Sequence, residues 1–171
     1  FGTQFFIDKR GQFWASNHSG IFSYHSKKQI FVRHPGSDSL SAGNIVADKN
    51  NIFWIGGYLG LQRFDPVSGK TNRFPHYKTI PQNNKSLSNS KIKTDSYGNI
   101  WVLSWGGGVY RFLPETSRFE QYTWVADPEF PEYFNIAKDI AECYDENGNR
   151  TLWIATEAGL MQMWLSPEES P

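Results

Sequence analysis

The sequence offers little on which redox chemistry or metal binding could rest. Cys143 is the only cysteine, so an internal disulfide and a thiolate metal site built by this chain alone are excluded. We expect Cys143 to act as a small buried hydrophobe. The four histidines match no metal-ligand spacing: His18, His25, His34 and His76. No metal and no cofactor is therefore predicted.

The sequence also lacks a dominant charge and a long apolar run. Seventeen Lys and Arg residues balance 17 Asp and Glu residues, so no net field attracts nucleic acid or an anionic membrane. No run reaches the roughly 18 to 20 apolar residues that a membrane span needs, and the N-terminus lacks the layout of a signal peptide. We expect a soluble segment that contacts neither nucleic acid nor a membrane and that folds as a single domain over residues 1–171.

What the sequence does contain is a fourfold internal repeat. The four copies begin at Phe5, Ile45, Ile92 and Ile140. Each copy carries an acidic residue, a polar turn, a Trp, a β-prone run and a Gly. The tryptophans that recur at one position are Trp14, Trp54, Trp101 and Trp153. Their spacings of 40, 47 and 52 residues suit one propeller blade per repeat.

Within each repeat the periodicity is that of strands. Apolar and polar residues alternate over short runs such as Leu61–Phe64, and helical spacing is not sustained. Each repeat is therefore predicted to form a four-stranded antiparallel blade, over residues 5–34, 44–77, 91–122 and 137–164. The last repeat ends after its third strand. We thus expect an all-β protein, a β-propeller of about four blades with the last incomplete, as part of a larger propeller.

The repeated residues are predicted to have structural roles. A large aromatic at one place in every copy fills the space between neighbouring blades. An aspartate lies six residues before the first three tryptophans, and its carboxylate is expected to accept backbone N–H bonds and close a hairpin. Asp145 lies eight residues before Trp153, which predicts a two-residue insertion in that turn. The alternatives are stacking of the indoles on a ligand, and metal or acid chemistry at the aspartates.

Ligand contacts are expected in the loops of one propeller face, where the second strand joins the third and each blade joins the next. The candidate ligand-binding residues in these loops are Asn17, His18, Tyr58, Trp105, Trp124 and Glu157. Trp105 and Trp124 stand out because neither occupies the repeated position, and an exposed aromatic beside polar neighbours suits carbohydrate or partner contact. The alternative is that each packs under its own loop. Trp164 is expected to pack at a blade edge, and no catalytic residue is predicted.

The repeats resemble the two-component regulator propeller repeat, in which D-x-x-G-N-x-W-I-G-T leads to G-G-L-x-R-F or Y and a closing aromatic strand. The best copy is TDSYGNIWVLSWGGGVYRFLPETSRFEQY, which begins at Thr94. The first repeat is less similar, because Ala15, Ser16 and Asn17 replace the usual hydrophobic and small residues. The resemblance implies the periplasmic sensor region of a membrane-bound, often hybrid, histidine kinase that controls carbohydrate use.

From the resemblance we expect an extracytoplasmic module that binds a small molecule or an oligosaccharide, with any kinase activity outside this segment. Two other functions remain open. One is a propeller enzyme such as a lyase or glycosidase, which needs acids or histidines gathered at the centre of one face. The other is a structural module that closes a ring with another chain, since open blade edges carry unpaired backbone groups and allow self-association.

Overall fold

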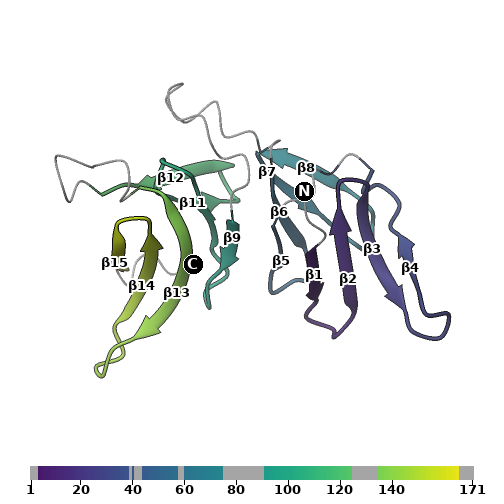
Figure 1. Ribbon diagram of the computed structural model, residues 1–171, viewed down its shortest axis with the longest axis horizontal. Coiled ribbons are helices and arrows are strands. Elements are labelled where there is room, and N and C mark those ends of the chain that lie inside the picture. The colour runs from purple at the N-terminus through teal and green to yellow at the C-terminus, as the bar shows by residue number, and fades with distance from the viewer. Residues whose placement is uncertain are drawn as a thin grey trace.

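The structure is a computed structural model that describes residues 4–38, 40, 44–57, 60–74, 91–124 and 135–165. Its secondary structure is a succession of strands, which form four antiparallel sheets (Figure 1). In these ranges there is no helix long and apolar enough to cross a membrane.

The sheets follow the repeats and are named blades 1 to 4. Blade 1 consists of β1 (Gln4–Ile7), β2 (Phe13–Asn17), β3 (Gly20–His25) and β4 (Ile30–Arg33). Blade 2 consists of β5 (Ile45–Ala47), β6 (Phe53–Gly57), β7 (Gly60–Phe64) and β8 (Thr71–Phe74). Blade 3 consists of β9 (Lys91–Thr94), β10 (Ile100–Leu103), β11 (Val109–Leu113) and β12 (Arg118–Tyr122). Blade 4 consists of β13 (Ala137–Tyr144), β14 (Arg150–Thr156) and β15 (Gly159–Trp164).

Each blade is a meander in which every strand pairs with the next along the chain. The first strands of successive blades contact one another, β1 with β5, β5 with β9 and β9 with β13. In Figure 1 the blades follow one another from β4 at one end of the molecule to β15 at the other. This is the arrangement of β-propeller blades. The predicted all-β fold of about four blades is confirmed, and the described part of the last blade has three strands.

The same tight turn joins the first two strands of every blade. In blade 3 the N–H of Asp95 donates to the carbonyl oxygen of Asn99 at 3.2 Å, and the N–H of Gly98 donates to that of Asp95 at 3.1 Å. One carboxylate oxygen of Asp95 accepts the N–H groups of Tyr97 and Asn99. The equivalent aspartates make the same bonds: Asp8, Asp48 and Asp145. These carboxylates close the hairpins, as the sequence predicts.

The other carboxylate oxygen holds the tryptophan of the repeat. The indole Nε1 atoms of Trp14, Trp54 and Trp101 donate to the aspartate of their own blade at 3.0, 2.9 and 2.8 Å. These three indoles are only 5%, 4% and 1% exposed, because each packs against the following blade. Trp101, for example, shares a hydrophobic cluster with Ile140 and Ile154 of blade 4. The main cores of the molecule therefore lie between blades.

Blade 4 departs from the interpretation of its sequence. The two extra residues do not enlarge the turn, since the N–H of Asp145 still donates to the carbonyl oxygen of Asn149, at 3.0 Å. Counted from the core pair Ile140 and Ile154, each strand instead continues two residues further than its counterpart in blade 3. The turn thus moves away from Trp153, and the prediction of a turn insertion is wrong. Trp153 is 38% exposed.

The fourth residue of each turn has a positive φ, and in blade 2 it is Asn51 rather than a glycine. Its φ is 62°, in the left-handed region that asparagine tolerates better than most residues. The Asn51 Nδ2 donates to the carboxylate of Asp8 at 3.1 Å, and its Oδ1 accepts the N–H of Lys9 at 3.1 Å. Asn51 therefore joins the turn of blade 2 to that of blade 1.

A buried ion pair network joins blades 3 and 4. The Arg150 guanidinium, in a side chain 7% exposed, contacts Asp95 through Nη2 and Glu142 through Nε, and lies 4.2 Å from the ring centroid of Tyr97. Burial raises the pKa of Asp95 and of Glu142. Hydrogen bonds to each carboxylate and the charge of Arg150 outweigh this effect, so both pKa values lie below their usual values. Both carboxylates are therefore ionised where the two blades meet.

Cys143 is exposed, so the expectation that it is buried is wrong. It pairs with Thr151, two residues along from the pair of Ala141 and Trp153. Cys143 therefore lies on the same side of the sheet as Trp153. In the described residues no following blade covers that side of blade 4.

Candidate functional site

Trp105 lies in the loop between β10 and β11, on the face where ligand contacts are expected. The N–H of Ser104 donates to the carbonyl oxygen of Gly108 at 3.0 Å, and the N–H of Gly108 donates to that of Asn135 at 2.8 Å. Gly108 has a φ of 76°, and a Cβ there would lie 2.1 Å from the carbonyl oxygen of Tyr122. The loop is thus fixed to its own blade and to the start of blade 4, while the Trp105 side chain is 61% exposed.

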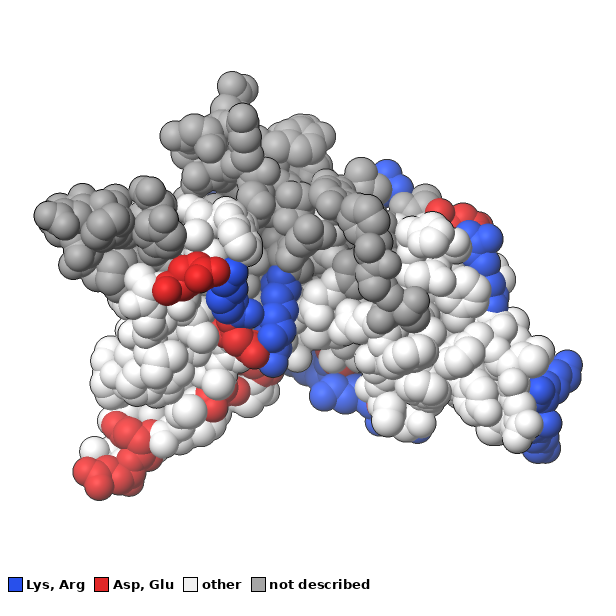
Figure 2. Space-filling view, in the orientation of Figure 1, with Lys and Arg blue, Asp and Glu red and all other residues white. Residues whose placement is uncertain are grey.

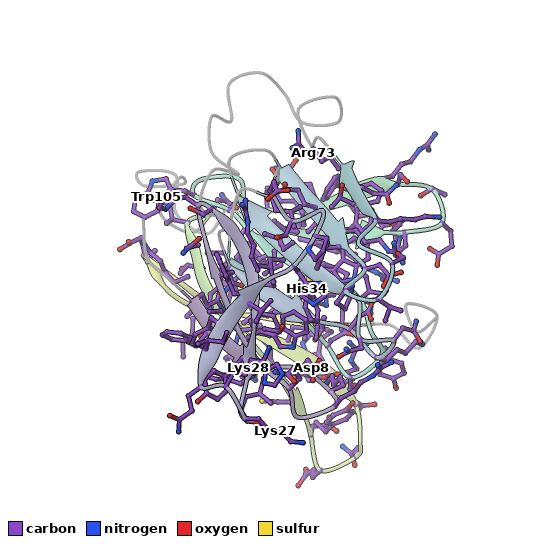
Figure 3. All side chains as sticks on the ribbon, turned by 90° about the vertical axis from the view of Figure 1, so that its right-hand side faces the viewer. Asp8, Lys27, Lys28, His34, Arg73 and Trp105 are labelled. Atoms are coloured by element: carbon purple, nitrogen blue, oxygen red, sulfur yellow. The ribbon has the colours of Figure 1, made fainter. Side chains whose placement is uncertain are left out.

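Two charged side chains of blade 4 join this indole. The Lys138 Nζ lies 3.8 Å from the centroid of the Trp105 ring, within the range of a cation–π interaction. The same Nζ lies 2.5 Å from the Glu157 Oε1, and the two side chains are 39% and 41% exposed. Figure 3 shows Trp105 near the top of the molecule, at the opposite end from Asp8 and its turn. Trp105, Lys138 and Glu157 form one cluster, which we call the loop-face cluster.

The loop-face cluster combines three kinds of contact on a fixed scaffold. The indole offers a flat apolar surface, the ammonium group of Lys138 offers hydrogen-bond donors, and the carboxylate of Glu157 offers acceptors. A sugar ring presents an apolar C–H surface and several hydroxyl groups, so this combination suits it. Because the ion pair is exposed, solvent screens it and a ligand hydroxyl can replace part of it at little cost.

The other predicted ligand residues do not join this cluster in the described structure. Trp124 is partly buried against the core between blades 3 and 4, and its backbone N–H donates to the Asn135 Oδ1 at 2.9 Å. The Asn17 Oδ1 accepts the N–H of Ser19 at 2.8 Å, and Asn17 and His18 belong to blade 1. Tyr58 lies outside the described residues.

Lys138 is the member that sequence reasoning missed. It lies in β13, where alternation from the buried Ile140 would place it on the core side, but a register shift between Ala137 and Asp139 breaks that alternation. Its contact with Trp105 depends on the pairing of Trp105 with Ile136, which brings the β10–β11 loop to the start of blade 4. No short-range sequence signal indicates this pairing.

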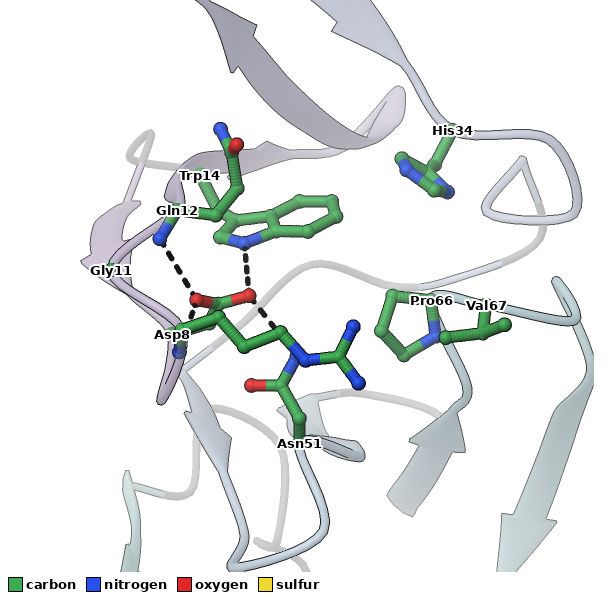
Figure 4. Close-up of a pocket in the computed structure, with 9 residues that line it drawn as sticks. Asp8, Gly11, Gln12, Trp14, His34, Asn51, Pro66 and Val67 are labelled. Atoms are coloured by element: carbon green, nitrogen blue, oxygen red, sulfur yellow. Dashed lines mark hydrogen bonds between the residues drawn. The ribbon is translucent and has the colours of Figure 1, made fainter.

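A hollow lies between blades 1 and 2, on the face opposite to the loop-face cluster (Figure 4). Its volume is about 400 Å³. The lining residues come from turns of both blades and from the chain after β4: Asp8, Arg10, Gly11, Gln12, Trp14, His34, Asn51, Pro66 and Val67. The sequence pattern places no ligand residue here, because the hollow forms only where turns of two blades meet.

The polar groups at the base of this hollow already have partners. The Asp8 carboxylate accepts bonds from the N–H groups of Arg10 and Gln12, from the indole of Trp14 and from Asn51. Burial raises the pKa of Asp8, but these hydrogen bonds outweigh it and place the pKa below its usual value. Asp8 is therefore an ionised structural residue rather than a proton donor.

Burial also lowers the pKa of His34. Its ring centroid lies 4.9 Å from that of Trp14, so His34 is held against the wall of the hollow. Within the described ranges, His, Cys, Asp and Glu side chains form no group of three or more that could hold a metal ion.

Comparison with known proteins places this fold among larger propellers. No family model matches the sequence, and no curated protein matches it. Solved structures do match. One is the extracellular domain of a putative hybrid two-component system, BT4673 from B. thetaiotaomicron, at 20% identity and a TM-score of 0.61 over 97% of this chain. The same domain, described in another structure as part of a putative one-component system, matches with a TM-score of 0.62.

Two further matches are more distant in sequence. An auxiliary nutrient binding protein from Bacteroides thetaiotaomicron is 11% identical, with a TM-score of 0.59 over 98% of this chain and 39% of its own. YCF48, in a structure with a D1 peptide, is 10% identical, with a TM-score of 0.59 over 95% of this chain and 50% of its own. The chain spans only 23% of the BT4673 domain. These likenesses establish the fold, as part of a propeller.

Proposed function

We propose that this chain is part of an extracytoplasmic sensor propeller that binds a carbohydrate through the loop-face cluster. The observation that carries the proposal is the exposed indole of Trp105 with Lys138 over its ring and Glu157 beside it. The similarity to the extracellular domain of a two-component system supports a sensing role, and the auxiliary nutrient binding protein shows that the same fold occurs in a binding protein.

Signal relay and phosphotransfer belong in this proposal to other parts of a longer protein. The propeller supplies a rigid scaffold, because three inter-blade tryptophans and four closed turns fix the loops relative to one another. A rigid loop loses little entropy when a ligand binds. The ligand would therefore be recognised by preformed contacts in the loop-face cluster.

The test is calorimetric binding of defined oligosaccharides, such as cello-, xylo- and galacto-oligosaccharides at millimolar concentration. Trp105→Ala is expected to weaken the binding of any sugar that binds by roughly tenfold, as for a central aromatic contact. Trp164→Ala is the matched control, because that indole is 60% exposed but lies in β15, outside the cluster. Equal effects of the two substitutions would contradict the site, and no binding across the panel would contradict the proposed ligand class.

A further inference from the structure

The hollow between blades 1 and 2, which we call the blade 1–2 hollow, has fixed walls. The chain after β4 packs so closely on the β7–β8 turn that a Cβ at Gly36 would lie 2.3 Å from the carbonyl oxygen of Gly69. At the base, the Asn51 Nδ2 donates to the Asp8 carboxylate at 3.1 Å. Both walls are formed by described blades of this chain, which a propeller of any size would keep side by side.

Two polar side chains that line this hollow, those of Arg10 and His34, have no polar partner in the described part of the chain. The Arg10 guanidinium and the His34 imidazole make no hydrogen bond and no ion pair with a described residue. Only their backbone N–H groups are bonded, to Asp8 at 2.9 Å and to Ile21 at 2.8 Å. Arg10 is exposed and His34 is half-buried. A bound molecule can therefore pair with both side chains without breaking a hydrogen bond of the fold.

The His34 ring is held in place and offers a hydrogen-bond donor. Its centroid lies 4.9 Å from that of Trp14 and 6.0 Å from that of Phe64. Because burial lowers the pKa of His34, its imidazole is neutral at pH 7, with one N–H donor and one acceptor nitrogen. Figure 4 shows His34 and Pro66 facing Asp8 across the hollow. A molecule in the hollow can thus meet a fixed N–H donor on one wall.

The turns around this hollow are basic. On this face, the turns of blades 1 and 2 carry six basic side chains: Lys9, Arg10, Lys27, Lys28, Lys49 and Lys70. The acidic residues of these turns each accept backbone N–H groups of their own turn: Asp8, Asp48 and Asp65. The corresponding turns of blades 3 and 4 carry acidic side chains and no basic one: Asp95, Glu115, Asp145 and Glu146. Figure 2 shows basic side chains at the lower right, over the β3–β4 turn, and acidic ones at the lower left, over the β13–β14 turn. The charge distribution therefore favours an anion at blades 1 and 2.

We propose that the blade 1–2 hollow is a second binding site, which takes a small organic carboxylate paired with Arg10 and hydrogen-bonded to the imidazole N–H of His34. A planar guanidinium matches a carboxylate with two parallel N–H···O bonds. A phosphate would need more donors, and the backbone N–H groups of Arg10 and Gln12 are already bonded to Asp8. The volume of about 400 Å³ lies in the range of small-molecule sites and admits a molecule about the size of one sugar ring. The site shares no residue with the loop-face cluster and does not depend on it.

The test is NMR titration of the indole N–H resonances with three carboxylates and their neutral counterparts: glucuronate with glucose, galacturonate with galactose, and benzoate with benzamide. At millimolar concentration, at least one carboxylate is expected to shift the resonance of Trp14, whose indole donates to Asp8 at the base of the hollow. The resonance of Trp105 should stay in place. The neutral counterpart of that carboxylate should bind at least about tenfold more weakly, because it offers Arg10 no charge.

Variants assign the binding to these residues. Arg10→Gln should weaken it by at least about tenfold, and His34→Phe, which keeps a ring against Trp14, by roughly threefold or more. Lys49→Gln is the matched control, because it removes an equal charge from an exposed side chain of the same face that does not line the hollow. Unchanged far-UV circular dichroism checks folding.

Three results would overturn the proposal: no shift of the Trp14 resonance with any of the carboxylates, equal binding of the neutral counterpart, or an equal loss in Lys49→Gln. A carboxylate that shifts only the Trp105 resonance would also overturn it, while supporting the loop-face cluster as the binding site. The proposed carbohydrate contact and this second site can therefore fail separately.

Discussion

Trp101 and Trp153 occupy equivalent positions in neighbouring blades, yet they differ in environment. Trp101 is 1% exposed and donates to Asp95 at 2.8 Å. Trp153 is 38% exposed, and the aspartate of its own turn has moved two residues further along the hairpin. The repeat places both indoles on the same side of their blades, but only a following blade buries one of them. Burial of the tryptophan is thus a property of the blade pair rather than of the repeat.

The largest expected effect comes from removing the two indoles in turn. Trp101→Ala should reduce the free energy of unfolding by about 3–5 kcal/mol, because it leaves a cavity between two blades. Trp153→Ala should reduce it by less than about 1 kcal/mol, because solvent already reaches that side chain. Urea unfolding of the two variants measures the difference. Equal losses would show that blade packing does not depend on the neighbour.

The ion pairs of blades 3 and 4 allow the same comparison between buried and exposed groups. Arg150→Met should cost about 3 kcal/mol, because it leaves the buried Asp95 carboxylate and the partly buried Glu142 carboxylate without their counter-charge. Lys91→Met removes an ion pair to Asp139 whose side chains are 39% and 48% exposed, and it should cost at most about 1 kcal/mol. Denaturation midpoints of the two variants check this, and a larger loss for Lys91→Met would refute it.

Asn51 tests the contact between blades 1 and 2 separately from the shape of its turn. Asn51→Gly keeps the positive φ and loses the bond to Asp8, for an expected cost of about 1 kcal/mol. Asn51→Ala also places a Cβ in the left-handed region and should cost about 1 kcal/mol more. Thermal unfolding of the pair separates the two terms. The interpretation fails if the glycine variant is the less stable one.

The smallest effect concerns acid. The pKa values of Asp8, Asp95 and Glu142 are lower in the folded chain than usual, so the fold stabilises their ionised forms. This contribution is present above the unfolded pKa values, near pH 4, and is lost as pH falls through the lower folded values. Stability should therefore decrease on acidification below about pH 4, and Asp95→Asn should reduce that slope. Stability that rises below pH 4 would contradict these directions.

The fold was largely predictable, because a repeat states its own period. Four recurring aspartates, four turns and alternating strands specify blades without any long-range information. The lengthened hairpin of blade 4 was not predictable, since a two-residue extension of paired strands preserves alternation and looks the same as a longer turn. The burial of Cys143 was predicted wrongly, because free cysteines are buried on average. This one lies on the side of blade 4 that no other blade covers in the described residues.

The site was predictable only in part. Trp105 and Glu157 could be placed on the loop face from topology alone. Lys138, which joins them, depends on how the start of blade 4 pairs with the preceding loop. Trp124 shows the converse, since a tryptophan in a loop with polar neighbours is packed against the core. Exposure of a single aromatic is therefore set by long-range contacts that a local pattern does not encode.

The most direct test of blade packing through tryptophan is hydrogen exchange of the indole N–H groups, followed by NMR. Resonances can be assigned by Trp→Phe substitution. The indoles of Trp14, Trp54 and Trp101 should exchange slowly, because each is buried and bonded to an aspartate, and Trp153 should exchange fast. Protection of Trp153 equal to that of Trp101, or fast exchange at all four, would contradict the account.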